Sequence, residues 1–273
     1  MHLVQLLSEV YANNKKNINL FFVCLILALV AYGPKLFFQS YASDDYANYM
    51  IEPSWYYFNS WLGRWAGSLL NHFFFSANQH VLPYFNSVLA ISLLVATGIV
   101  VSLTWEIKQR VPIALISLLI ALSPYWANNL WFNVNTGVSI GLLVSAIAIW
   151  MLCNKNTWPY YLLATLLLAI GAGIYQPIVE AVGIIVIGQL YIRLINADNL
   201  ESLKRVFFQF SLLSGIVIIA NVISIGINQL TLSIADTTVR EGARYDEALS
   251  LPLRDILYLV CLLYTSPSPR DRG

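Results

Sequence analysis

An apolar run near the N-terminus decides the fold class of this chain. Residues 18–38 read INLFFVCLILALVAYGPKLFF and contain a single charged residue, Lys35. A helix needs about 20 mostly apolar residues to cross the hydrocarbon core of a bilayer. The segment before the run is polar, and the run has no small-residue cleavage site. It therefore predicts an uncleaved first membrane span rather than a removed signal peptide.

The composition extends this interpretation to the whole chain. Hydrophobic residues make up 58%, charged residues make up 11%, and the mean hydropathy is +0.67. Soluble domains carry about 25% charged residues, so this chain has too few charges to cover a water-facing surface. The net charge of +1 gives no reason to expect a nucleic-acid partner, and the three cysteines form no paired motif. We expect an all-α polytopic membrane protein.

Further apolar runs predict about seven or eight transmembrane helices. The candidate spans are Ile18–Phe38, Val81–Leu103, Val111–Tyr125, Val134–Leu152, Trp158–Tyr175, Pro177–Ile195 and Val206–Leu230, with an eighth that begins near Leu251–Leu263. The final string LLYTSPSPRDRG interrupts this last run with prolines and charges, which are costly inside a span. We expect one transmembrane domain over residues 1–260, incomplete at its C-terminus, and a non-native tail over residues 261–273.

Basic residues predict the orientation of the chain in the membrane. If the spans alternate in direction, one side holds Lys15, Lys16, Lys108, Arg110, Lys155, Arg193, Lys204 and Arg205. Lys and Arg are enriched in cytoplasmic loops, so this side and the N-terminus are expected in the cytoplasm. The opposite side carries the long loops Gln39–His80 and Thr231–Leu253 and most of the acidic residues. Unusually long loops are often functional, so we expect the site on the outer side.

The first outer loop contains a helical pattern. Its apolar residues recur at spacings of three and four: Trp55, Phe58, Leu62, Trp65 and Leu69. The polar residues of another face are Ser60, Arg64, Ser68 and Asn71. The pattern predicts an amphipathic helix that lies in the outer membrane interface. A packed connector between spans is the alternative, because a large apolar face also suits burial.

Two adjacent carboxylates follow the first span, in the stretch SYASDDYANY at residues 40–49. Repulsion between them makes one a better proton acceptor, which suits a general base, and carboxylate oxygens also suit Mg²⁺ or Mn²⁺. Asp44 and Asp45 are therefore candidate catalytic residues, or ligands of a divalent cation. Tyr46 beside them offers a hydroxyl and a flat face to a sugar. The alternative is a solvated loop that marks the end of a span.

Arginines are the candidate ligands of a donor phosphate, because a guanidinium can hold a phosphate through two parallel hydrogen bonds. Arg64 lies in the predicted interfacial helix, at the depth of lipid headgroups. Arg240 and Arg244 are four residues apart in the second long outer loop and would share a helix face. For Arg64 the alternative is snorkelling to phospholipid headgroups. For the other two arginines it is an ordinary solvated loop.

The segment GAGIYQPIVE at residues 171–180 joins the fifth and sixth predicted spans on the outer side. Its glycines allow close helix approach. Gln176 and Glu180 are four residues apart, on one helix face. Glu180 is expected about one turn inside the apolar zone, where an ionisable residue indicates function. A hydrogen bond that fixes helix packing is the alternative.

Three of these stretches resemble a known family. SDDY after the first span, LGRWAGSLL in the same loop and GAGIYQP between later spans are similar to motifs of the serotype-converting O-antigen glucosyltransferases. The resemblance covers most of residues 17–260. It implies a GT-C fold and an inverting hexosyltransferase that takes a sugar, with glucose expected, from a polyprenyl-phosphate carrier. It also implies a bacterial inner membrane protein with its active site facing the periplasm or exterior.

The resemblance further implies roles for individual residues. Asp44 would be the general base, and Asp45 would orient the acceptor or assist electrostatically. The family's Gly-Arg-Trp motif would place Arg64 on the donor phosphate. Tyr175 and Gln176 match the family's Tyr-Gln pair. With Tyr46, Trp65 and Glu180, which we single out from the residues themselves, they are the expected substrate-binding residues.

A transporter or flippase of lipid-linked sugars is the alternative function. Such proteins thread polar residues through several spans and contain pairs of broken helices. The predicted spans here are mostly apolar, and the polar residues collect in the outer loops, which favours the enzyme. The expected partners are a polyprenyl-phosphate-linked sugar, a glycan acceptor such as the O-antigen of lipopolysaccharide, and the lipid bilayer. Beyond the divalent cation, no cofactor is expected.

Overall fold

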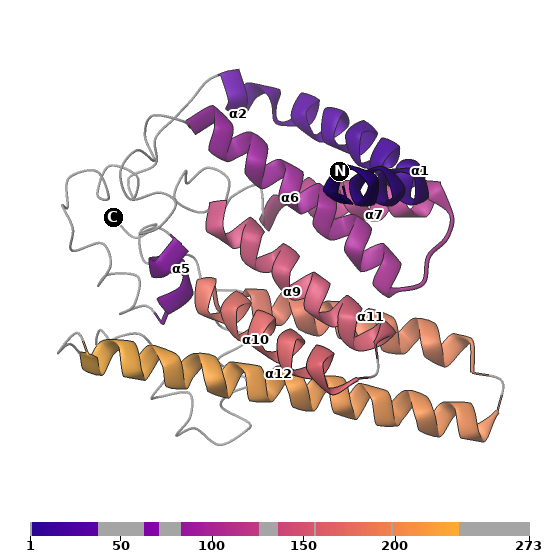
Figure 1. Cartoon of the computed structure of the whole chain (residues 1–273), viewed down its shortest axis with the longest axis vertical. Coiled ribbons are helices and arrows are strands. Elements are labelled where there is room, and N and C mark those ends of the chain that lie inside the picture. Colours follow the sequence, from indigo (N-terminus) through magenta and orange to yellow (C-terminus); the bar gives the residue numbers. More distant parts are fainter. Residues whose placement is uncertain are drawn as a thin grey trace.

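The computed structural model describes residues 2–37, 63–70, 83–125, 136–155, 157–197 and 199–234. These residues form helices and no strand (Figure 1). The helices are α1 (His2–Ala31), α2 (Gly33–Phe37), α5 (Trp65–Leu70), α6 (Pro83–Thr104), α7 (Arg110–Ala121), α9 (Thr136–Asn154), α10 (Trp158–Ile174), α11 (Ile178–Ile195) and α12 (Leu200–Ile234). The all-α expectation is confirmed.

The helices coincide with the predicted spans. α6, α9, α11 and α12 are long and apolar enough to cross a membrane. Shorter apolar helices lie in α1, α7 and α10, at Asn17–Ala31, Arg110–Ala121 and Trp158–Ile174. Together they account for each of the spans predicted before residue 231, which confirms a polytopic membrane protein. The predicted eighth span and the tail lie outside the described residues.

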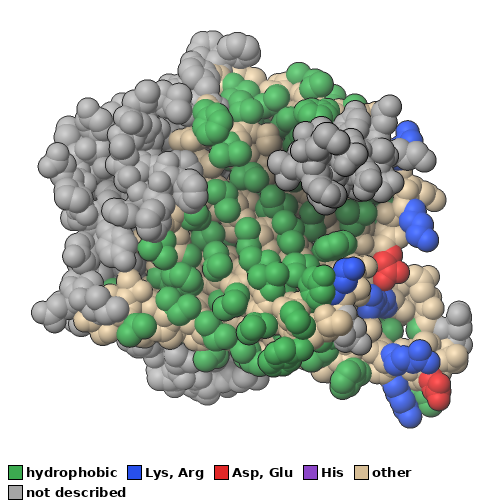
Figure 2. All heavy atoms as spheres, in the orientation of Figure 1, with side chains coloured by type: hydrophobic (Ala, Val, Ile, Leu, Met, Phe, Trp, Pro, Cys, Tyr) green, Lys and Arg blue, Asp and Glu red, His purple; other side chains and the backbone are tan. Residues whose placement is uncertain are grey.

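Consecutive spans run in alternating directions, so their connections fall at two ends of the bundle (Figure 1). One end, here named the basic end, holds the α6–α7, α9–α10 and α11–α12 connections with Lys108, Lys155 and Arg193 at or beside them. The other, named the α5 end, holds α5 and the turn from α10 to α11. In Figure 2, Lys and Arg side chains gather at one edge and apolar side chains cover the middle of the face. Arg64 lies at the α5 end, directly before α5.

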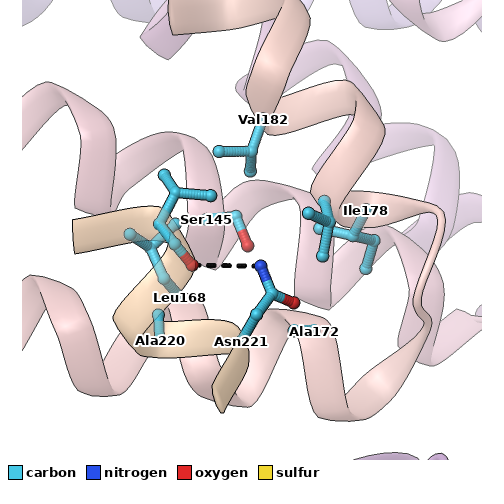
Figure 3. Close-up of a pocket in the computed structure, with 9 residues that line it drawn as sticks. Ser145, Leu168, Ala172, Ile178, Val182, Ala220 and Asn221 are labelled. Carbon is cyan, nitrogen blue, oxygen red and sulfur yellow. Dashed lines mark hydrogen bonds between the residues drawn. The ribbon is translucent and has the colours of Figure 1, made fainter. Parts of the chain in front are cut away.

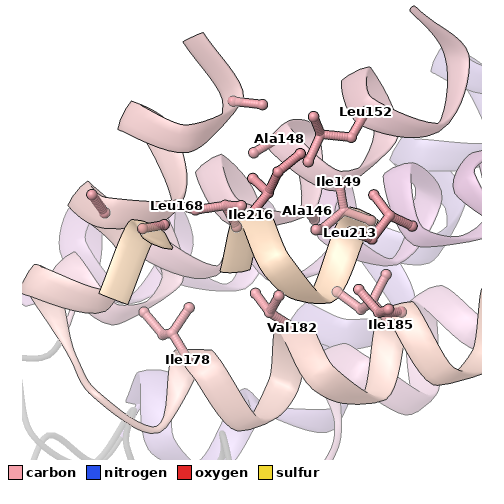
Figure 4. Packing of buried hydrophobic residues seen from close by; sticks show 14 of the residues in the cluster. Ala146, Ala148, Ile149, Leu152, Leu168, Ile178, Val182, Ile185, Leu213 and Ile216 are labelled. Carbon is pink, nitrogen blue, oxygen red and sulfur yellow. The ribbon is translucent and has the colours of Figure 1, made fainter. Parts of the chain in front are cut away.

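Two clusters of buried apolar side chains hold the helices together. The larger draws on α9, α10, α11 and α12, with Ile149, Leu168, Val182 and Ile216 among its members (Figure 4). The other draws on α1, α6, α7 and α9. α9 belongs to both and is the most enclosed of the four long spans, with 67% of its apolar window buried. A helix buried on all sides is apolar all round, which explains why apolar residues occur on every face of α9.

A polar network closes the basic end. Arg193 Nη2 of α11 lies 3.1 Å from Glu106 Oε1, and Arg193 Nη1 also donates to Gln209 of α12. Gln189 Nε2 donates to the same Glu106 oxygen at 3.5 Å. Glu106 has a φ of 61°, a conformation that is uncommon outside glycine. The network ties the α6–α7 connection to α11 and α12.

A glycine sets the closest approach between α6 and α7. A Cβ added at Gly98 would lie 2.3 Å from the Cα of Ser117. Since lipid tails are as apolar as the side chains, helices in a membrane associate largely through such tight van der Waals contact. A residue larger than glycine would push the two helices apart.

We expect Gly98→Ala to lower the free energy of unfolding by about 2 kcal/mol or more, because the new methyl group meets backbone that cannot move aside. Gly215→Ala in α12 is the matched control, since nothing lies within 4 Å of its added Cβ. Alanine there should raise stability by about 0.5–1 kcal/mol through helix propensity. Denaturant unfolding in detergent micelles measures both. Equal effects would contradict the close α6–α7 contact.

Candidate functional site

The predicted site residues fall into two groups. The structure places Arg64, Trp65, Tyr175, Gln176 and Glu180. The other predicted site residues lie outside the described residues: Asp44, Asp45, Tyr46, Arg240 and Arg244. Within the described ranges, no group of three His, Cys, Asp or Glu side chains could hold a metal ion. The predicted carboxylate ligands are not in those ranges, so the cation remains a prediction.

Arg64 and Tyr175 come together at the α5 end. The guanidinium carbon of Arg64 lies 4.7 Å from the centroid of the Tyr175 ring, which is a cation–π contact. Gly63, with a φ of 77°, turns the chain into α5, and the Arg64 carbonyl accepts the Ser68 N–H at 2.9 Å. Tyr175 directly follows α10, where its own N–H donates to the Gly171 carbonyl at 3.2 Å. Arg64 is therefore held at the start of α5, and Tyr175 is held at the end of α10.

Trp65 anchors α5 to two spans. Its indole Nε1–H donates to Ser224 Oγ of α12 at 3.0 Å. The ring lies against Gly173 of α10, where an added Cβ would be 2.2 Å from Nε1. The indole therefore needs a residue without a side chain at position 173, and its polar atom is bonded inside the protein. These contacts hold α5 against α10 and α12. Binding of substrate by the Trp65 ring stays a prediction.

The short helix α5 packs through small residues. Ser68 is 2% exposed and Leu69 is 37% exposed, and a Cβ added at Gly67 would lie 3.1 Å from the Ile174 carbonyl oxygen of α10. The pattern had placed Ser68 on the polar face and Leu69 on the apolar face. Close approach to α10 admits small side chains irrespective of polarity, so the buried side differs from the expected one. The helix is confirmed over Trp65–Leu70, and its earlier part lies outside the described residues.

The remaining candidates lie where α10 turns into α11. Gln176 is partly buried, and its backbone carbonyl accepts the Val179 N–H at 2.9 Å. Glu180 is in the first turn of α11, and its side chain is exposed rather than enclosed between helices. A carboxylate in a first turn is favoured by the helix dipole. Within the described residues Glu180 makes no ion pair, and no described contact joins it to the Arg64–Tyr175 pair.

α12 carries polar residues that the sequence reasoning did not single out. Asn221, Ser224 and Asn228 recur at spacings of three and four, which places them on one helix face. Ser224 and Asn228 are each 5% exposed, so this face is turned into the bundle. The spacing is readable in the sequence, but the surrounding span reads as mostly apolar. Without the fold, nothing identifies Ser224 as the partner of Trp65.

A small pocket lies among α9, α10, α11 and α12 (Figure 3). The Ser145 hydroxyl and the Asn221 side chain point toward each other there, and Asn221 Nδ2 donates to the Val217 carbonyl at 3.0 Å. The rest of the lining is apolar. The space admits about one water molecule, so a sugar ring does not fit.

The anchor predicts energetic coupling between Trp65 and Ser224. We expect Ser224→Ala to lower the unfolding free energy by about 1 kcal/mol, because it removes the acceptor of a shielded indole N–H. In the Trp65→Phe background, Ser224→Ala should lower the unfolding free energy by about 1 kcal/mol less than it does in wild type. A double-mutant cycle, with denaturant unfolding in micelles, measures this difference.

Ser92→Ala is the control for this cycle, since the Ser92 hydroxyl donates to the Val88 carbonyl of its own helix at 2.7 Å. It should not couple to Trp65→Phe. Additive effects of the Trp65 and Ser224 changes would contradict the hydrogen bond between them.

Comparison with known proteins assigns the chain to a family. Neither the curated proteins nor the solved structures give a match. The family model described as glucosyl transferase GtrII matches residues 33–265. This range includes most of the chain: the helices from α2 to α12, the Arg64–Tyr175 pair and the predicted acidic pair. It agrees with the resemblance carried by the three short motifs. The chain therefore belongs to the GtrII glucosyl transferase family.

Proposed function

We propose that this protein transfers a glucosyl group from a polyprenyl-phosphate carrier to a surface glycan such as O-antigen, at the outer face of the bacterial inner membrane. The family is one of glucosyl transferases, which supports the identity of the transferred group. The observation that carries the choice of donor is the Arg64–Tyr175 pair at one end of a membrane bundle.

The chemistry of the donor explains why an arginine is useful there. A polyprenyl chain lies in the hydrocarbon, so its phosphate is confined to headgroup depth. Arg64 lies beyond the last turn of α10, where spans end. The Tyr175 ring packs on the guanidinium at 4.7 Å, and stacking on the flat face is compatible with hydrogen bonds in the guanidinium plane. An arginine held this way suits two oxygens of a phosphate.

The distribution of charge supports an outward-facing α5 end. The basic residues at or near the opposite end are Lys108, Arg110, Lys155, Arg193, Lys204 and Arg205. By the positive-inside rule, that end faces the cytoplasm. The α5 end then faces the periplasm, where a lipid-linked donor and a surface glycan can meet. This orientation also puts the N-terminus in the cytoplasm.

The reaction gives the predicted carboxylates their roles. Asp44 removes the proton from an acceptor hydroxyl, whose oxygen attacks C1 of the glucosyl group. The bond from C1 to the phosphate oxygen breaks, and polyprenyl phosphate leaves with the bonding electrons, so the anomeric centre is inverted. Asp45 orients the acceptor, and Arg64 stabilises the charge that grows on the phosphate, aided by Arg240 and Arg244. A GT-C-like bundle would hold these groups in one layer, since attack requires an approach of about 3 Å.

The phosphate role of Arg64 predicts a graded loss of activity. We expect Arg64→Gln to lower kcat/KM for the lipid-linked donor by about 100-fold or more, because a charge-assisted contact is lost. Arg64→Lys should retain part of the activity, since it keeps the charge but not the planar fork. Transfer from polyprenyl-phosphate-glucose to an isolated acceptor glycan in proteoliposomes measures this effect.

Variants of the stacking partner complete the test. Tyr175→Phe keeps the ring beneath the guanidinium and should leave kcat/KM for the donor unchanged. Tyr175→Leu removes the ring and should lower kcat/KM, but by less than Arg64→Gln does. If Arg64→Gln transfers glucose at the wild-type rate, the phosphate role is wrong.

The base role of Asp44 predicts a loss in the same assay. Asp44→Asn should reduce kcat by about 100-fold or more, as expected when a general base is removed, and Asp45→Asn should have a smaller effect. EDTA treatment followed by Mg²⁺ or Mn²⁺ tests whether a cation acts with the two carboxylates. Failure of the wild-type protein to use any polyprenyl-linked sugar, together with movement of the donor across the bilayer, would instead support the transporter.

A further inference from the structure

We propose that Asn228 of α12 binds a hydroxyl group of a sugar substrate, next to the site that contains Arg64. This inference rests on the proposed function, because it takes the substrates to be sugars. It adds a residue that neither the motifs nor the family match assigns to substrate.

The first observation is a buried acceptor that has no donor. Asn228 is 5% exposed, and its Oδ1 has no hydrogen-bond partner in the part of the chain that the structure describes. A buried polar atom without a partner costs about 1–3 kcal/mol, so such atoms are few in native proteins and call for an explanation. A carboxamide oxygen accepts hydrogen bonds from O–H and N–H donors. Sugar hydroxyls are such donors.

Two neighbouring polar side chains on α12 donate hydrogen bonds within their own helix. Asn221 Nδ2 donates to the Val217 carbonyl at 3.0 Å, and Thr231 Oγ1 donates to the Ile227 carbonyl at 2.9 Å. Both are donors, which can use the carbonyl one turn earlier. The oxygen of Asn228 cannot do so, because a carbonyl offers no proton. Its partner has to come from outside the helix.

The second observation is the position of Asn228 relative to the anchor of α5. It lies one turn after Ser224 on the same face, about 6 Å further along the helix axis, in the direction of the α5 end. Ser224 holds Trp65, the residue next to Arg64. Because the glucosyl group is joined directly to the donor phosphate, its hydroxyl groups lie within several ångströms of the group that binds that phosphate. Asn228 therefore lies one helical turn beyond the residue that holds α5 in place.

Shielding makes this contact effective. An amide oxygen away from bulk water forms a stronger hydrogen bond than an exposed one. A site built to bond a hydroxyl also rejects analogues that lack it, since its own polar group is then left unpaired. Asn228 would therefore contribute to sugar specificity as well as affinity.

The matched variants are Asn228→Leu and Asn221→Leu, which make the same change two turns apart on one helix face. Asn228→Leu should raise the KM for one sugar substrate by about tenfold or more, while its thermal midpoint stays equal to that of wild type or rises, because an unpaired buried amide has been replaced by an apolar group. Asn221→Leu should leave KM within about twofold of wild type. An effect on the KM of the lipid-linked donor assigns the hydroxyl to the transferred sugar, and an effect on the KM of the acceptor assigns it to the glycan.

A series of monodeoxyglucose donors and monodeoxy acceptors identifies the hydroxyl. For one of these analogues, wild type should lose about tenfold in kcat/KM while Asn228→Leu loses nothing further. The inference is wrong if Asn228→Leu transfers with wild-type KM values. It is also wrong if Asn228→Leu lowers the thermal midpoint and still loses kcat/KM with every deoxy analogue on which wild type loses it. In both cases, transfer by the wild-type protein still supports the proposed function. If wild type transfers no sugar from any polyprenyl donor, the proposed function and this inference are both wrong.

Discussion

The indole of Trp65 is the contact on which the candidate site depends. It bonds Ser224 of α12 and fills the space left by Gly173 of α10. α5 has six residues, far fewer than an isolated helix needs to be stable in water. Its position therefore comes from these tertiary contacts, and the position of Arg64 follows from that of α5. The cation–π pair with Tyr175 completes an arrangement in which residues distant in sequence define one location at the end of the bundle.

The membrane imposes a second constraint. Backbone polar groups are satisfied within helices, and apolar side chains face lipid over the middle of the bundle (Figure 2). Polar side chains are then tolerated where they meet a partner inside the protein. The Glu106–Arg193 network at the basic end and the Trp65–Ser224 bond satisfy this rule. Within the described residues, four buried side chains have a polar atom that does not satisfy it: Asn86, Ser145, Gln189 and Asn228. Of these, Asn228 lies one turn from Ser224, which bonds Trp65, and this position is why we connect it with a ligand.

Much of the fold was accessible from the sequence. A span is a local property, since about 20 apolar residues in succession suffice to indicate it, and each run predicted before residue 231 corresponds to an apolar helix. The division of α5 into faces was not accessible, because it depends on how closely α10 approaches. Ser68 is buried and Leu69 is exposed, the reverse of what polarity alone indicates. The exposure of Glu180 was not accessible either, because periodicity places a residue on a face but does not say what covers it.

The sequence by itself determined the class of the protein, the positions of its spans and the family motifs, since hydropathy and short motifs are written in consecutive residues. The candidate acids at residues 44 and 45 were also chosen from the sequence, and their role remains a prediction. The tertiary structure decided which residues meet: Arg64 with Tyr175, Trp65 with Ser224 and Gly173. It also turned Asn228 into the bundle. Such contacts depend on the rotation and spacing of whole helices, which close packing around small residues sets and which local sequence does not encode.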